Sequence, residues 1–99
     1  NNIFSWWIFM KKDKKLIAWA RRQLLRNFIR YRVFGKHHWR EDTLKKRFPD
    51  HLRKYAIISA KELKRKGILI CKPTPHGKQW WLNRKKMTEI NEILEEGVV

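Results

Sequence analysis

The chain has 99 residues, 42% of them hydrophobic, and this length suffices for one small domain with a modest core. Its 25 lysines and arginines against 9 aspartates and glutamates give a net charge of +16. Such an excess opposes compaction unless a polyanion neutralises it, which favours nucleic acid as a partner and an anionic membrane surface second. Cys71 is the single cysteine, which excludes an intramolecular disulfide and favours the cytoplasm.

Residues 1–13 are predicted to form an N-terminal extension that is apolar at first and then basic. Its apolar run, residues 3–10, is too short to cross a membrane and lacks the features of a secretory signal. Met10 begins a Met-Lys-Lys-Asp-Lys-Lys run typical of a chain start, so residues 1–9 are interpreted as an upstream extension. The aromatic residues expected to dock on this domain, on a partner protein or on a base are Trp6, Trp7 and Phe9.

A long helix is predicted over residues 14–34. Its apolar residues, from Ile17 to Tyr31, recur every three or four positions, which is the spacing of one buried face, and Gly35 is expected to end it. Five arginines occupy much of the remaining surface, more than solubility requires. Guanidinium groups fork onto phosphates and stack on bases, so these arginines are candidate nucleic-acid contacts. They are Arg21, Arg22, Arg26, Arg30 and Arg32.

A short helix over residues 41–48 and a longer helix over residues 50–66 are predicted next, separated by Pro49. Asp50 is expected to cap the longer helix, and Gly67 to take the left-handed conformation that ends it. Cations cover much of the polar side of this longer helix. They either contact nucleic acid, as we favour, or belong to a solvated face. They are Arg53, Lys54, Lys61, Lys64 and Arg65.

A β-hairpin is predicted over residues 68–82, because two β-prone runs flank a turn rich in proline and glycine. Residues 37–39 are interpreted as either a short strand or a loop. A final helix is predicted over residues 84–96, with Asn83 as its cap and Gly97 as its stop. The hairpin carries three candidate phosphate contacts, although a plain solvated hairpin explains them nearly as well. They are Lys72, His76 and Lys78.

This order of elements resembles the winged-helix (winged helix-turn-helix) family. The resemblance covers roughly residues 16–95 and rests on Leu-Lys-Lys-Arg-Phe-Pro at 44–49, on Ala56, Ala60 and Leu63 before Gly67-Ile-Leu-Ile, and on the Gly77-bearing hairpin that ends in Trp-Leu-Asn. It implies one domain over residues 14–97, mainly α-helical with a β-hairpin wing. It also implies that the helix over 50–66 and the wing face nucleic acid.

The arginines of the first helix favour structured RNA over duplex DNA, since folded RNA can touch several faces of a protein at once. The chain is similar in style to small basic ribosomal proteins with winged-helix cores. That similarity implies a non-enzymatic role bound to rRNA, beside other proteins of a large complex. The alternative is a DNA-binding transcription regulator that inserts the helix over 50–66 in the major groove. A protein-interaction module that docks through exposed aromatic residues is the third hypothesis.

No catalytic residue, metal site or cofactor is expected. The four histidines and Cys71 lack the paired spacing of zinc ligands, and no nucleophile motif or Gly-rich phosphate loop is present in the sequence. A membrane partner fits least, because residues 3–10 have no polar face. Trp19, Trp39 and one of Trp80 and Trp81 are expected in the core, since neighbours in a strand face opposite sides.

Overall fold

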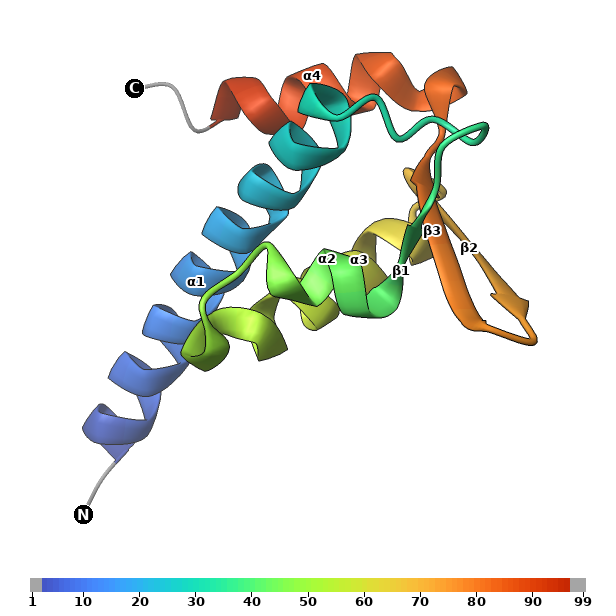
Figure 1. Cartoon of the computed structure of the whole chain (residues 1–99). Coiled ribbons are helices and arrows are strands. Elements are labelled where there is room, and N and C mark those ends of the chain that lie inside the picture. Colours follow the sequence, from blue (N-terminus) through green and yellow to red (C-terminus); the bar gives the residue numbers. More distant parts are fainter. Residues whose placement is uncertain (1–2, 97–99) are drawn as a thin grey trace.

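The protein is described from a computed structural model, which gives the backbone of residues 3–96 and the side chains of residues 12–96. It is mainly helical, with one small antiparallel sheet of three strands. The long helix α1 crosses the molecule, and α4 lies across the C-terminal end of α1 (Figure 1). Helix α3 packs along the middle of α1, α2 packs against α3, and the sheet stands beside them (Figure 1). The elements are α1 (Ile3–Arg30), β1 (Trp39–Arg40), α2 (Glu41–Lys46), the 3-10 turn η1 (Asp50–Leu52), α3 (Arg53–Arg65), β2 (Leu69–Thr74), β3 (Gly77–Leu82), the 3-10 turn η2 (Arg84–Lys86) and α4 (Met87–Glu96).

Helix α1 begins earlier than the predicted residue 14, so most of the predicted extension belongs to it. No proline or glycine interrupts residues 3–30, and the first turns project beyond the other elements (Figure 1). The side chains of Trp6, Trp7 and Phe9 lie outside the described residues.

The predicted C-terminal end of α1 is wrong: the helix ends at Arg30 and not at residue 34. Arg32 takes a left-handed conformation, with φ of 54°. The Val33 amide donates to the Phe28 carbonyl at 2.9 Å, and the Arg32 amide to the Ile29 carbonyl at 3.1 Å. These two bonds form a Schellman motif, in which the buried Val33 packs beside the last core turn of the helix. Arg32 therefore ends α1, three residues before Gly35.

The predicted helix over 50–66 consists of η1 followed by α3. Asp50 does not cap it, because its carboxylate is paired with Arg53 at 2.6 Å. The prediction for Gly67 is confirmed: its φ is 75°, and its amide and that of Ile68 close the same Schellman motif on the last turn of α3. The short helix α2 ends two residues before the predicted residue 48.

The strand order is β1-β3-β2, with both pairings antiparallel. The hairpin β2–β3 agrees with the prediction to within one residue, and residues 39–40 supply the short strand β1. Trp80 faces the core and is buried, as one of the two neighbouring tryptophans was expected to be. Trp81 faces the other side of the sheet, where Gly35 and His38 cover it in part.

The core joins α1 to α3 and the sheet. Trp39 is buried, whereas Trp19 is only partly buried and meets the ring of Phe48 edge-on. Asn83 has the predicted capping role at η2: its side chain accepts from the Lys85 amide at 3.1 Å. The predicted stop at residue 97 lies outside the described residues. The largest fully buried side chains are Trp80, Phe28, Leu24, Leu25, Leu44, Leu63, Leu69, Leu82, Ile90, Val33 and Ser59.

Candidate nucleic-acid interface

Helix α3 presents one cationic stripe to solvent, which we call the α3 stripe. Lys54, Ile58, Lys61 and Arg65 are spaced four, three and four residues apart, so they lie along one side of the helix, and all four are exposed. Ile58 is 43% exposed, which gives the stripe an apolar point between its cations. The opposite side of α3 is buried against α1. The stripe can therefore meet a ligand without disturbing the core.

A groove of about 310 Å³ lies between α3 and the hairpin. Lys78 reaches it because it alternates with Trp80 along β3, and so shares the side of the sheet that faces α3. Among the described residues that line the groove, none is acidic. An anion such as a phosphate is therefore the group that its charge favours. The lining residues are Lys61, Lys64, Arg65, Cys71, Lys78 and Trp80.

The Cys71 thiol is half-buried in this groove. Burial raises the pKa of the thiol above its ordinary value, while the charges of Lys64 and Lys78 act in the opposite direction. The cysteine therefore lines the groove as a neutral group.

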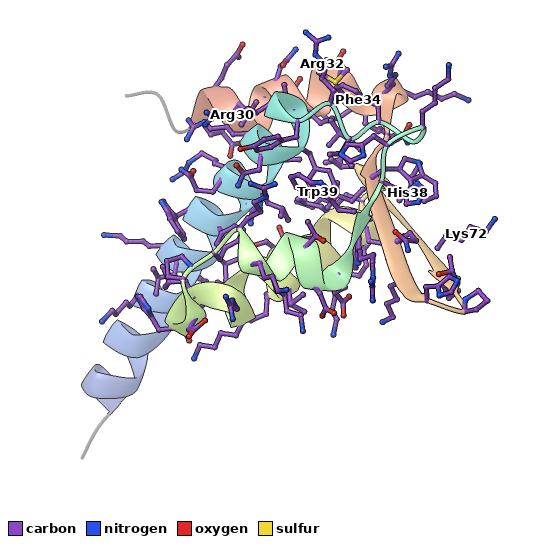
Figure 2. All side chains as sticks on the ribbon, in the orientation of Figure 1. Arg30, Arg32, Phe34, His38, Trp39 and Lys72 are labelled. Atoms are coloured by element: carbon purple, nitrogen blue, oxygen red, sulfur yellow. The ribbon has the colours of Figure 1, made fainter. Side chains whose placement is uncertain are left out.

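The three predicted contacts of the hairpin are separated in space. Lys78 lines the groove, but Lys72 pairs with Gln79 and lies on the other face of the hairpin. Figure 2 shows Lys72 at the outer side of the hairpin. His76 lies in the turn, where its amide donates to the Thr74 hydroxyl at 3.2 Å. A ligand in the groove thus meets one of the three.

Arg53, another predicted contact, is engaged within the chain. Its Nη1 lies 2.6 Å from the Asp50 carboxylate, and its Nε donates to the Phe48 carbonyl at 3.2 Å. The residue joins the turn after α2 to the start of α3. We therefore assign it to the support of the interface and not to its contact surface.

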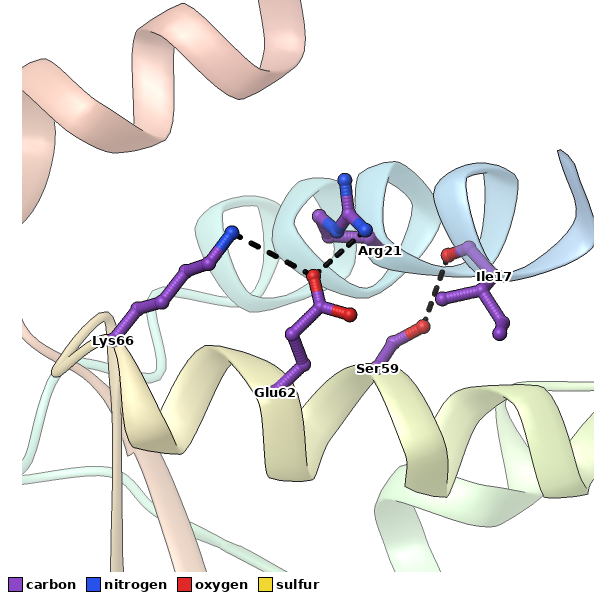
Figure 3. Close-up of polar contacts among 5 residues, drawn as sticks. All are labelled: Ile17, Arg21, Ser59, Glu62 and Lys66. Carbon is purple, nitrogen blue, oxygen red and sulfur yellow. Dashed lines mark hydrogen bonds and ion pairs between the residues drawn. The ribbon is translucent and has the colours of Figure 1, made fainter. Parts of the chain in front are cut away.

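Arg21 is likewise engaged within the chain, because it lies on the side of α1 that faces α3. Its Nη2 is 2.7 Å from the Glu62 carboxylate, which Lys66 also approaches at 3.7 Å (Figure 3). The side chains of Arg21 and Glu62 are 20% and 22% exposed. One turn earlier, the Ser59 hydroxyl donates to the Ile17 carbonyl at 3.0 Å. Arg21 thus belongs to the contact between the two helices.

Arg22, Arg26 and Arg30 form a second cationic stripe, which we call the α1 stripe. They are spaced four residues apart, on the side of α1 turned away from α3; Arg26 and Arg30 are exposed and Arg22 is half-buried. Arg32 does not continue this stripe, because it lies in the loop after α1.

The sequence did not indicate the aromatic cluster at the end of the α1 stripe. Tyr31 was expected on the buried face, but it is 41% exposed because α1 ends just before it. The Arg47 guanidinium lies 4.3 Å from the centre of the Tyr31 ring and 5.1 Å from that of Trp39. Arg30 approaches Tyr31 from 5.7 Å. No spacing rule relates these residues, since only the folded chain brings Arg47 to α1.

Comparisons with protein-family models, with curated proteins and with solved structures found no match to this chain. Among the described residues, no group of three histidine, cysteine or acidic side chains is arranged to hold a metal ion. No helix in the described part of the chain has the length and apolar character needed to cross a membrane.

Proposed function

We propose that this chain is a winged helix-turn-helix protein that binds structured RNA and catalyses no reaction. The order of its elements supports the fold: α2, a tight turn and α3 give a helix-turn-helix, and the hairpin β2–β3 follows as the wing. The strand β1 before α2 pairs with β3, so the wing is attached to the helical core through the sheet.

The observation that carries the RNA proposal is the presence of two cationic surfaces on opposite sides of the α1–α3 pair. One consists of the α3 stripe and the groove, and the other is the α1 stripe. A straight duplex seated on α3 and the wing would leave the α1 stripe in solvent. A folded RNA can contact both surfaces, because its helices and loops turn around a protein.

The charge balance supports a polyanionic partner. Within residues 12–96, ion pairs engage only Arg21, Arg53 and Lys66 among the cations. The many remaining cations repel one another unless a ligand or counterions neutralise them. We favour a small ribosomal or ribosome-associated protein of the cytoplasm as the form of this function, since its size and charge are similar to small basic ribosomal proteins with winged-helix cores.

A DNA-binding transcription regulator is the second candidate function. The α3 stripe and the groove favour it, because in DNA-binding winged helices this helix enters the major groove. Such a regulator would need only one of the two cationic surfaces, and the two candidates therefore differ in what they require of the α1 stripe.

Binding measured by fluorescence anisotropy over a range of salt concentrations separates the two functions. The ligands are a folded rRNA fragment and a DNA duplex. The variant pairs are Lys61→Ala with Lys64→Ala for the groove, Arg26→Ala with Arg30→Ala for the α1 stripe, and Lys46→Ala with Lys85→Ala as the matched control. Each lost phosphate contact should reduce the magnitude of the negative slope of log K against log salt by about 0.7–0.9.

For RNA, we expect the groove double variant and the α1-stripe double variant each to bind with lower affinity. In each, the plot of log K against log salt should become less steep by about 1.5. The control pair should leave both quantities close to those of the unaltered protein. RNA binding that does not depend on the α1 pair, together with tighter binding to duplex DNA, would reject the RNA proposal in favour of the regulator. Failure to bind either ligand at low salt would reject both.

A further inference from the structure

A second hollow, of about 420 Å³, lies between the loop after α1 and the start of η2. We call it the loop pocket. The Leu82 amide donates to the Val33 carbonyl at 2.8 Å, which ties the loop to the end of β3 directly before η2. Figure 2 shows Arg32 and Phe34 close together, where the end of α1 meets α4. The lining residues are Arg32, Phe34, Lys36, His37 and Arg84.

The lining combines three cations with two aromatic rings. Among the described residues that line it, none is acidic, and within residues 12–96 Arg32, Lys36 and Arg84 take part in no ion pair. The positive charges are therefore not balanced locally, which favours an anionic ligand. The volume lies within the range of about 300–1,000 Å³ that is typical of small-molecule sites.

Arg32 occupies a backbone position that a glycine would fill at lower cost. A residue with a side chain is strained in the left-handed conformation, and α3 uses Gly67 at the equivalent position of the same motif. Residues in such conformations cluster at functional sites. The side chain of Arg32 lines the loop pocket, which provides a use for a guanidinium at this position.

Arg84 and Phe34 form a cation–π pair at the pocket. The guanidinium carbon of Arg84 lies 4.6 Å from the centre of the Phe34 ring. Phe34 is half-buried against the core, and the capping bond of Asn83 fixes the turn that carries Arg84. A guanidinium held in this way can stack its free face on a planar group, and its N–H groups can still bind a phosphate.

We propose that the loop pocket binds one unpaired nucleotide, with its phosphate on Arg32 and Lys36 and its base stacked on the Arg84–Phe34 pair. A nucleotide supplies both groups that the lining favours, a phosphate and a planar ring, and unpaired bases of RNA are commonly held on aromatic and arginine side chains. The identity of the polymer rests on the proposed function, whereas nucleotide binding itself can be measured without it.

The first test is a titration of the full-length chain with AMP and, separately, with inorganic phosphate. Amide NMR spectra monitor each titration. We expect AMP to shift the amides of residues 32–37 and 84, and phosphate to shift them with about tenfold lower affinity. Arg84→Lys keeps the charge but removes the planar stack, so AMP should bind it only as well as phosphate does. Lys85→Ala removes a neighbouring exposed charge outside the pocket and should bind AMP normally.

Shifts confined to the groove between α3 and the hairpin, or unchanged AMP affinity in Arg84→Lys, would overturn the proposal. Equal affinities for AMP and phosphate in the unaltered chain would also overturn it, since the base would then make no contact. The spectrum of the rest of the chain reports whether each variant is folded.

The second test separates this proposal from the RNA proposal. An RNA hairpin with one bulged nucleotide should bind about fivefold more tightly than its fully paired counterpart, and Arg84→Lys should abolish the difference. If neither RNA binds while AMP still does, the RNA proposal fails and the pocket stands. If both RNAs bind equally and AMP does not bind, the pocket proposal fails and the RNA proposal stands.

Discussion

Helices α1 and α3 end in the same backbone motif, with Arg32 in one and Gly67 in the other at the left-handed position. This equivalence makes the cost of a side chain at that position measurable in both directions. Gly67→Ala introduces the cost, and Arg32→Gly removes it.

The magnitude for Gly67→Ala follows from two opposing terms. A left-handed residue with a side chain costs about 1–2 kcal/mol, and the smaller conformational entropy of alanine in the unfolded chain returns about 0.4–1 kcal/mol. The added Cβ would lie 3.6 Å from Cε of Lys86, which is an ordinary contact and adds no steric cost. We therefore expect a loss of about 1 kcal/mol in the free energy of unfolding. By the same terms with reversed sign, Arg32→Gly should gain about 1 kcal/mol.

Urea unfolding followed by tryptophan fluorescence measures both changes, and an unchanged m-value would show that only stability has altered. Arg32→Ala is the matched control, because it keeps the left-handed strain and removes the guanidinium; its stability should stay within about 0.5 kcal/mol of the unaltered chain. An unchanged midpoint for Gly67→Ala, or a loss of stability in Arg32→Gly, would refute the reasoning. Arg32→Gly should also weaken AMP binding, so that stability increases while binding decreases.

Three further predictions concern the contact between α1 and α3. Arg21→Met keeps the aliphatic stem but leaves the mostly buried Glu62 without its closest partner. The free energy of unfolding, measured in urea, should therefore fall by about 1–3 kcal/mol. A weaker salt dependence of RNA binding in this variant would contradict the structural role of Arg21. Leu63→Ala empties a fully buried site and should cost about 2–5 kcal/mol in the same assay; a loss below about 1 kcal/mol would contradict the packing of α3. The Tyr55 hydroxyl donates to the Asp13 carboxylate at 2.8 Å, and this bond raises the pKa of the phenol above its ordinary value of 10.0. The folded state therefore favours the protonated phenol, so stability should fall as the pH rises above about 10, and Tyr55→Phe should show a smaller fall in alkaline thermal melts.

Features that depend on local chemistry could be predicted from the sequence. The hairpin follows from two β-prone runs around a Pro/Gly turn, the end of α3 from Gly67, and the burial of one of Trp80 and Trp81 from alternation along a strand. Only the structure shows that Trp80 is the buried one. Each of these rules relates residues that are close in the chain. The mainly helical composition with a small sheet follows from the same patterns.

The end of α1 could not be predicted by such rules. Gly35 is the residue that a local rule selects, yet Arg32 takes the left-handed position because Val33 must be buried beside Phe28. The gain from tertiary packing exceeds the conformational preference of one residue. The same is true of Arg21, which is one of five similar arginines in the sequence and is distinguished only by Glu62, 41 positions away, on the facing helix.

By itself the sequence determined that the chain is a small, strongly basic domain of helices and one hairpin, since composition and periodicity depend only on which residues are present and how they are spaced. Only the tertiary structure decided which cations are exposed to a ligand, because ion pairs, grooves and contacts of guanidinium groups with aromatic rings arise between residues distant in the chain. Arg21 and Arg53 have partners within the fold, and Lys61, Lys64 and Lys78 gather in one groove. The loop pocket is likewise a product of folding, since Arg32 and Arg84 meet only when the loop after α1 is hydrogen-bonded to the end of β3.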